Sequence, residues 1–118
     1  MAKAQGFPRE ARLRSRADFD RVFQEGRRGR GRFMMVCCAP NGQGRARLGV
    51  ALRRGWRTAV ARNRAKRLVR EAFRTHKDAL PPGFDLVVVP ATNWAEPSVA
   101  EIAQELIRLT RVAAEALR

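Results

Sequence analysis

Five cationic side chains and one amide recur between residues 62 and 74 at spacings that an α-helix, at about 100° per residue, brings to one side. Arginine can bind phosphate oxygens through two parallel hydrogen bonds, and lysine supplies a point charge. Like charges four residues apart repel by roughly 0.2–0.5 kcal/mol per pair, and no acid interrupts this side. The pattern favours an external polyanion over an ordinary solvated helix face, which is the alternative. This cationic face consists of Arg62, Asn63, Lys66, Arg67, Arg70 and Arg74.

The cationic face needs a helix that is anchored on its opposite side. No Gly or Pro interrupts residues 58–77, and the hydroxyl of Thr58 can accept from the free amides of a first helical turn. Arg64 lies about 60° beyond the cationic face and nearer to Glu71, so it could bind the same anion or pair with that acid. The opposite side predicts packing on a core through Ala61, Ala65, Leu68, Val69, Ala72 and Phe73.

Two aromatic residues, Phe19 and Phe23, share one face of a shorter helix that is expected over residues 15–25, with Ser15 as its N-cap. Aromatic residues at this spacing commonly belong to a core. Their rings could also form a wall on which unpaired bases stack, at roughly 1–3 kcal/mol per base. Trp56 stands between arginines and is either a second stacking residue or an anchor of its loop.

Residues that could form a catalytic centre in the polypeptide are sparse. A nuclease site needs clustered carboxylates or paired histidines, whereas the acids are scattered and His76 is the single histidine. Cys37 and Cys38 are adjacent, which disfavours a disulfide and predicts two core residues of a strand. We therefore expect no catalytic residue, metal or cofactor in the protein, and the free thiols favour the cytoplasm.

The composition indicates a folded protein with a polyanionic partner. The 118 residues carry a formal net charge of +14 and are 45% hydrophobic, so the chain can bury a core and still attract nucleic acid, the commonest polyanion. No apolar stretch is long enough to span a bilayer, and no membrane partner is expected. We expect one domain over residues 1–118, with residues 1–14 flexible around Gly6 and Pro8.

The elements that must position these residues follow from the remaining pattern. The tract 27–32, RRGRGR, is interpreted as a basic loop that could contact phosphate. Residues 33–39 and 45–52 predict two antiparallel strands that are joined by a hairpin-type turn at residues 41–44.

The second half of the chain predicts a buried strand and a last helix. The apolar run 84–89 predicts a central strand that is covered on both faces, and Ser98 with Glu101 predicts a capping box. The expected fold is α+β, a small mixed sheet packed with helices in the order helix, strand, strand, helix, strand, helix.

One segment is specific enough to resemble a known family. Residues 48–50, the pair Arg53 and Arg54, and above all residues 59–73 are similar to bacterial ribonuclease P protein subunits, which carry Arg-Asn-Arg-x-Lys-Arg-x-x-Arg on a helix after a strand. Residues 12–26 and the valine run after Gly83 resemble other parts of the same family.

The resemblance implies a function that composition alone could not. In this family the protein binds a catalytic RNA, in a 1:1 complex, and the 5′ leader of precursor tRNA. The assembly is an endoribonuclease that makes the mature tRNA 5′ end, and its RNA carries the chemistry with magnesium. The resemblance also implies an unusual left-handed βαβ crossover, against the general right-handed rule.

Roles are carried over position by position. The resemblance assigns binding of the catalytic RNA to Arg62, Asn63, Arg64, Lys66, Arg67 and Arg70, which the helical pattern extends to Arg74. It assigns a leader-binding cleft, between the N-terminal helix and the sheet, to Phe19, Phe23, Val36, Arg53 and Arg54, with Trp56 added as a stacking candidate. The chain departs from the family in having no tyrosine, with Val36 at that expected place, and in having Arg57 at a position usually occupied by glycine.

Two other functions share the same basic helix. A ribosomal or other structural RNA-binding protein of similar fold would have the cationic face but no use for a leader cleft. A DNA-binding regulator could place residues 58–77 in a major groove, but no compact helix-turn-helix partner stands beside that segment.

Overall fold

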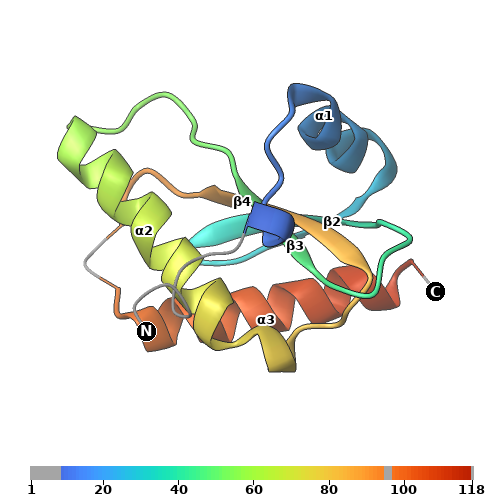
Figure 1. The fold of residues 1–118 in the computed structure, drawn as a ribbon. Coiled ribbons are helices and arrows are strands. Elements are labelled where there is room, and N and C mark those ends of the chain that lie inside the picture. Colours follow the sequence, from blue (N-terminus) through green and yellow to red (C-terminus); the bar gives the residue numbers. More distant parts are fainter. Residues whose placement is uncertain (1–8, 95–96, 118) are drawn as a thin grey trace.

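A four-stranded sheet lies between one helix on one face and two helices on the other (Figure 1). The computed structural model describes residues 9–94 and 97–117. The strands are β1 (Arg27–Arg30), β2 (Met34–Pro40), β3 (Arg47–Val50) and β4 (Phe84–Pro90), and the helices are α1 (Arg16–Glu25), α2 (Ala59–Thr75) and α3 (Val99–Glu115). Short 3-10 turns, η2 (Arg9–Ala11) and η3 (Lys77–Ala79), precede α1 and follow α2. The mixed α+β sheet with packed helices is confirmed.

The helix boundaries follow the capping residues. The Ser15 hydroxyl accepts from the Asp18 amide at 3.1 Å, and the Thr58 hydroxyl accepts from the Ala61 amide at 3.0 Å. Ser98 and Glu101 form the expected capping box of α3. The basic helix is shorter at its end than expected, because α2 stops at Thr75 and tightens into η3.

The strand order corrects the expected hairpin. The order is β1-β2-β4-β3, so β4 separates β2 from β3, and β3 runs parallel to β4 while the other pairs are antiparallel. β4 is buried from Asp85 to Pro90 and needs a neighbour on both edges. Asn41, which was expected in the hairpin turn, instead contacts the residue just before β4. Its backbone N–H donates to the Gly83 carbonyl. The handedness of the β3-α2-β4 crossover stays a prediction.

The tract 27–32 is also not the loop that was expected, because Arg27–Arg30 forms the edge strand β1 against β2. The turn that follows is held by the buried carboxylate of Glu105, which accepts from the amides of Arg32, Phe33 and Met34 at 2.7–2.9 Å. Charged residues are well suited to an edge strand because they discourage pairing with other chains. The basic tract therefore has a structural role, as an edge strand, that its composition did not predict.

Residues 9–14, which were expected to be flexible, attach to the sheet. Ala11 and Leu13 are buried, and the Leu13 amide donates to the Leu48 carbonyl at 2.9 Å. Residues 1–8, which were also expected to be flexible, lie outside the described residues. No helix among the described residues is long and apolar enough to cross a membrane.

Two apolar clusters lie on opposite faces of the sheet. The larger one joins α2 and α3 to the sheet through residues such as Val36, Phe73 and Leu106. The smaller one lies beneath α1 and contains Val22, Met35 and other residues, with Phe19 and Phe23 packed at its border. Two helices cover one face and the ten-residue α1 alone packs on the other, where Met35 and Val89 each keep 7% of their surface exposed.

Candidate functional site

The cationic face of α2 forms as expected. Arg62, Asn63, Arg67 and Arg70 are exposed, while Lys66 is half-buried. The opposite side of the helix anchors it on the larger cluster through the buried residues Ala65, Val69, Ala72 and Phe73. The described residues offer no acidic partner within salt-bridge distance to Arg62, Lys66, Arg67 or Arg70. This end of the molecule therefore presents a row of cations to solvent.

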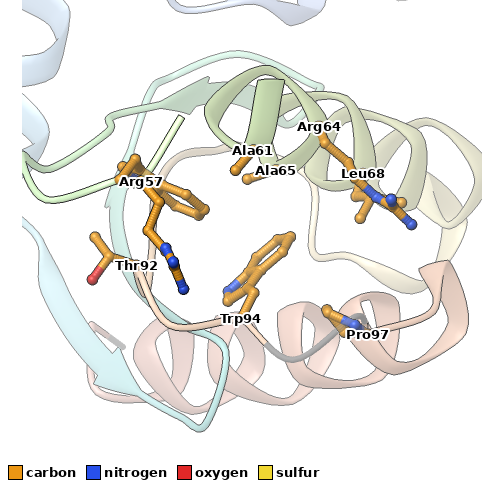
Figure 2. Close-up of a pocket in the computed structure, with 9 residues that line it drawn as sticks. Arg57, Ala61, Arg64, Ala65, Leu68, Thr92, Trp94 and Pro97 are labelled. Atoms are coloured by element: carbon orange, nitrogen blue, oxygen red, sulfur yellow. The ribbon is translucent and has the colours of Figure 1, made fainter. Parts of the chain in front are cut away.

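At the last turn of α2, the row of cations is no longer free of acidic partners. Arg74 binds Glu71 through two hydrogen bonds, of 3.2 Å from Nε and 2.6 Å from Nη2, and is half-buried. Glu71, the acid considered as a partner for Arg64, is thus engaged by Arg74. Arg64 extends beside Leu68 at the rim of a pocket (Figure 2). The cation row is most exposed in the first three turns of α2.

On the other face of the sheet, α1 runs across the strands from β3 to β1. A side chain at Gly49 of β3 would place its Cβ 2.6 Å from Phe19 Cζ, so the absence of a side chain there lets the ring approach the strand. At the other end, the guanidinium carbon of Arg28 lies 5.5 Å from the centroid of the Phe23 ring, within cation–π distance. Both rings are half-buried, which leaves an edge of each in solvent.

A buried carboxylate fixes the position of α1. Asp85 is fully buried and binds Arg21 of α1, Arg47 of β3 and Asn41. Both contacts to Arg47 measure 2.7 Å. Burial alone would raise the pKa of Asp85, but the hydrogen bonds from Arg47 and Asn41 and the attraction to Arg47 and Arg21 bring that pKa below its ordinary value. The cations here are engaged in holding the fold.

A hollow of about 110 Å³ lies at one end of β1, β2 and β4, where Met35 and Val89 line it from the face that α1 covers. α1 reaches Cys37, whose thiol donates to the Val22 carbonyl at 3.1 Å, and the hollow begins two residues away at Met35. Met35 pairs with Val89 and with Arg30 in register across the sheet. We call this the sheet hollow, and it is lined by Arg30, Met35, Arg53, Val89 and Pro90 among others.

Three residues expected in the leader cleft stand elsewhere. Val36 is fully buried in the cluster beneath α2 and α3, so it faces away from the sheet hollow, and its neighbour Met35 takes the expected place. The assignment of Val36 is therefore wrong. Trp56 packs edge-to-face on Trp94 at 6.1 Å, in a pocket whose described lining includes no residue of α1. Arg53 lines the sheet hollow, whereas Arg54 is exposed outside it.

The two cysteines are buried strand residues, as expected. They point to opposite faces because side chains alternate along a strand. Burial raises the pKa of both thiols, that of Cys38 to about 12 with help from Cys37 and Asp85. Both thiols are protonated at neutral pH and serve packing.

Sequence reasoning missed the arginines of the sheet. Arg28 and Arg30 lie two residues apart on β1, so both point to the face that α1 covers. Interpreting this tract as a loop could not predict that shared orientation. Arg47 and Asp85 are opposite one another in the β3–β4 register, a contact between strands that are far apart in the chain.

These features define a small α+β protein with a cationic helix on one side and, on the other, an N-terminal helix and a small hollow at the end of the sheet. The family model described as Ribonuclease P matches residues 7–114, and the chain belongs to this family. Membership implies a role in the tRNA-processing endoribonuclease ribonuclease P and partnership with its RNA.

Named relatives agree with the family model. The ribonuclease P protein component of Thermotoga maritima is 40% identical over 92 residues, which cover 78% of this chain and 79% of the relative. The solved RNase P protein from Thermotoga maritima matches with a TM-score of 0.76 and 35% identity, over 85% of this chain and 96% of that one. The Staphylococcus aureus RNase P protein matches with a TM-score of 0.74 and 27% identity, over 87% and 94%.

Proposed function

We propose that this chain binds the catalytic RNA of ribonuclease P through α2 and the 5′ leader of precursor tRNA through the sheet face beside α1. The observation that carries the proposal is the separation of two surfaces. The cationic face of α2 has exposed cations without acidic partners among the described residues, and the sheet hollow combines apolar strand residues with Arg30 and Arg53.

The α2 surface suits a folded RNA. Phosphate contacts by arginine and lysine give affinity that is strong and largely independent of sequence. Asn63, which is exposed among the arginines, can bind a base or sugar edge or orient its neighbours. In this proposal the face holds one protein on one catalytic RNA.

The sheet face suits a single strand. Unpaired bases can pack on the half-buried rings of Phe19 and Phe23, at roughly 1–3 kcal/mol per stacked base. Phosphates of an extended strand would meet Arg30 and Arg53 at the sheet hollow. A folded, mature tRNA end offers no such strand, so this surface would favour the precursor.

The polypeptide would contribute binding and positioning, while the catalytic RNA carries the hydrolysis with magnesium. The described residues contain no group of three or more His, Cys, Asp or Glu side chains placed to hold a metal ion. In this proposal the magnesium requirement belongs to the RNA.

Reconstitution with the catalytic RNA from the same source tests the proposal. We expect the protein to restore cleavage of precursor tRNA at a magnesium concentration where the RNA alone is inactive, and to tighten binding of precursor over mature tRNA. A protein that binds RNA but produces neither effect would be a structural RNA-binding protein of similar fold instead.

A further inference from the structure

A pocket of about 130 Å³ lies between the first three turns of α2 and the segment that follows β4 (Figure 2). Ala61, Ala65 and Leu68 line the pocket from the helix, and Trp56 and Trp94 are among its other lining residues. Protein interiors seldom leave such a space between large side chains. A cavity of roughly 150 Å³ lined by apolar groups accepts one benzene-sized ring. The pocket therefore has the size of a single planar ring.

The two tryptophans differ in how their N–H groups are satisfied. Trp94 Nε1 donates to the Phe33 carbonyl at 2.6 Å, which fixes that ring. Trp56 Nε1 is buried, yet it has no hydrogen-bond partner among the described residues. A buried donor without an acceptor is unfavourable, and most such groups in folded proteins are paired. The pocket thus offers aromatic surface together with a donor that lacks an acceptor.

The charged residues at the pocket indicate which class of molecule could bind in it. Arg57 lies at one side of the pocket and Arg64 at the other, with the Trp94 ring between them (Figure 2). No acidic residue is among the described residues that line it. The same helix carries the cationic face, of which Arg67 lies one position before the lining residue Leu68. A planar ring with edge acceptors, on a chain of negative charges, is a nucleobase in RNA.

We propose that this pocket receives one unpaired nucleobase of the catalytic RNA that α2 binds, stacked on the Trp94 ring and directing an edge acceptor at Trp56 Nε1, because the two indole planes meet at 76°. This inference rests on the proposed function and adds to it a base-binding site that is separate from the leader cleft. Arg57 would hold the phosphate beside the inserted base. The catalytic RNA is the source because the pocket belongs to α2, whereas the leader surface lies beside α1.

Intrinsic fluorescence tests the pocket directly, because Trp56 and Trp94 are the two tryptophans of the chain. Titration of the full chain with catalytic RNA should quench the indole emission to a plateau. Uridine monophosphate, whose base is a single ring, should quench it weakly but saturably at millimolar concentration, and ribose 5-phosphate, which lacks the base, should not. Quenching by precursor tRNA alone with no response to the catalytic RNA would overturn the proposed source.

A matched pair of variants separates pocket filling from changes to the helix. Ala61→Leu fills the pocket from α2, whereas Ala59→Leu places the same side chain at an exposed position of the same turn, outside the lining. We expect Ala61→Leu to weaken binding of the catalytic RNA about tenfold and to abolish the quenching, with Ala59→Leu close to wild type. Circular dichroism and thermal unfolding of both variants establish that each is folded.

The outcomes distinguish this inference from the function on which it rests. If the wild-type protein binds the catalytic RNA tightly but without quenching, or if both variants bind equally well, the base pocket is wrong and the subunit role stands. If the protein has no affinity for the catalytic RNA, both proposals fail. If Ala61→Leu alone loses binding and quenching, the pocket is a base site.

Discussion

The cationic face of α2 and the sheet face beside α1 are both rich in arginine, but they use it differently. Beside α1, Arg21 and Arg47 bind the buried Asp85, and Arg28 lies over the Phe23 ring. On α2, Arg67 and Arg70 are exposed and have no acidic partner among the described residues. A cation with a partner positions an element, whereas a cation without one can bind an external phosphate.

This difference separates two kinds of RNA recognition. Binding by exposed cations depends strongly on salt and weakly on shape. Binding on half-buried aromatic rings depends on the position of a helix, and here that position is fixed by one carboxylate. Changes at Asp85, Phe19 and Arg67 should therefore have effects of different kinds, as well as of decreasing size.

The largest effect is expected from Asp85→Asn, which removes the charge that holds Arg21 and Arg47. Removing one partner of a buried ion pair leaves the other uncompensated, and we expect a loss of about 3 kcal/mol in the free energy of unfolding, at the lower end of the usual range because both arginines keep some access to water. The melting temperature should fall by roughly 10 °C. Asp20→Asn is the control, because Asp20 is exposed and pairs with Arg16 only at 4.0 Å.

The same residue predicts a dependence on pH. The pKa of Asp85 is lowered in the folded protein, so its contribution to stability is complete above the ordinary value of 3.8 and is lost as the pH falls from there through the lower folded value. The difference in unfolding free energy between wild type and Asp85→Asn should therefore be constant near neutrality and shrink below about pH 4. A difference that is constant down to pH 2 would show that the charge of Asp85 is not what holds α1.

Phe19→Ala should have a smaller effect on stability and a specific effect on binding. The ring is half-buried, so its loss should lower the melting temperature by several degrees without unfolding the protein. If bases pack on this ring, the preference for precursor over mature tRNA should fall between about 5-fold and 150-fold, the equivalent of roughly 1–3 kcal/mol. Binding of the catalytic RNA should be unchanged.

Phe84→Ala is the matched control for that experiment. Phe84 is also half-buried, but it packs against the cluster on the α2 and α3 side. Both variants should lose stability, and only Phe19→Ala should lose the preference for the leader. Equal preferences in the two variants would return Phe19 to a purely structural role.

Local patterns in the sequence predicted the elements well and their neighbours poorly. Thr58, Ser98 and the apolar run of β4 act through residues close to them in the chain, so the helix starts and the buried strand could be predicted. Residues 27–30 of the basic tract form a strand because they pair with β2, and the turn after them is held by Glu105, which is more than 70 residues away in the chain. Contacts between residues this far apart in the chain cannot be predicted from a local sequence pattern.

The errors in the site have the same cause on a finer scale. Val36 and Met35 are neighbours, but a shift of one residue along a strand moves a side chain to the other face of the sheet. Trp56 was added to the leader cleft as a stacking candidate because it stands beside Arg54 and Arg57 in sequence. Its contact with Trp94 depends on the crossover that brings β4 beside β3. The cationic face was predictable because all its members lie on one helix.

The smallest change in affinity is expected from Arg67→Ala, which removes one exposed cation of α2. Each phosphate contact contributes about 0.9 to the slope of log K against log salt concentration, so this variant should bind the catalytic RNA with a slope that is flatter by about that amount. Arg108→Ala is the control, because Arg108 is exposed on α3 and lies 3.6 Å from Glu105, and its loss should leave the slope unchanged. An equal slope in Arg67→Ala and wild type would mean that Arg67 does not contact phosphate. Because the preference for precursor tRNA depends on the other face of the molecule, Arg67→Ala should retain it, and a loss of that preference would contradict the separation of the two surfaces.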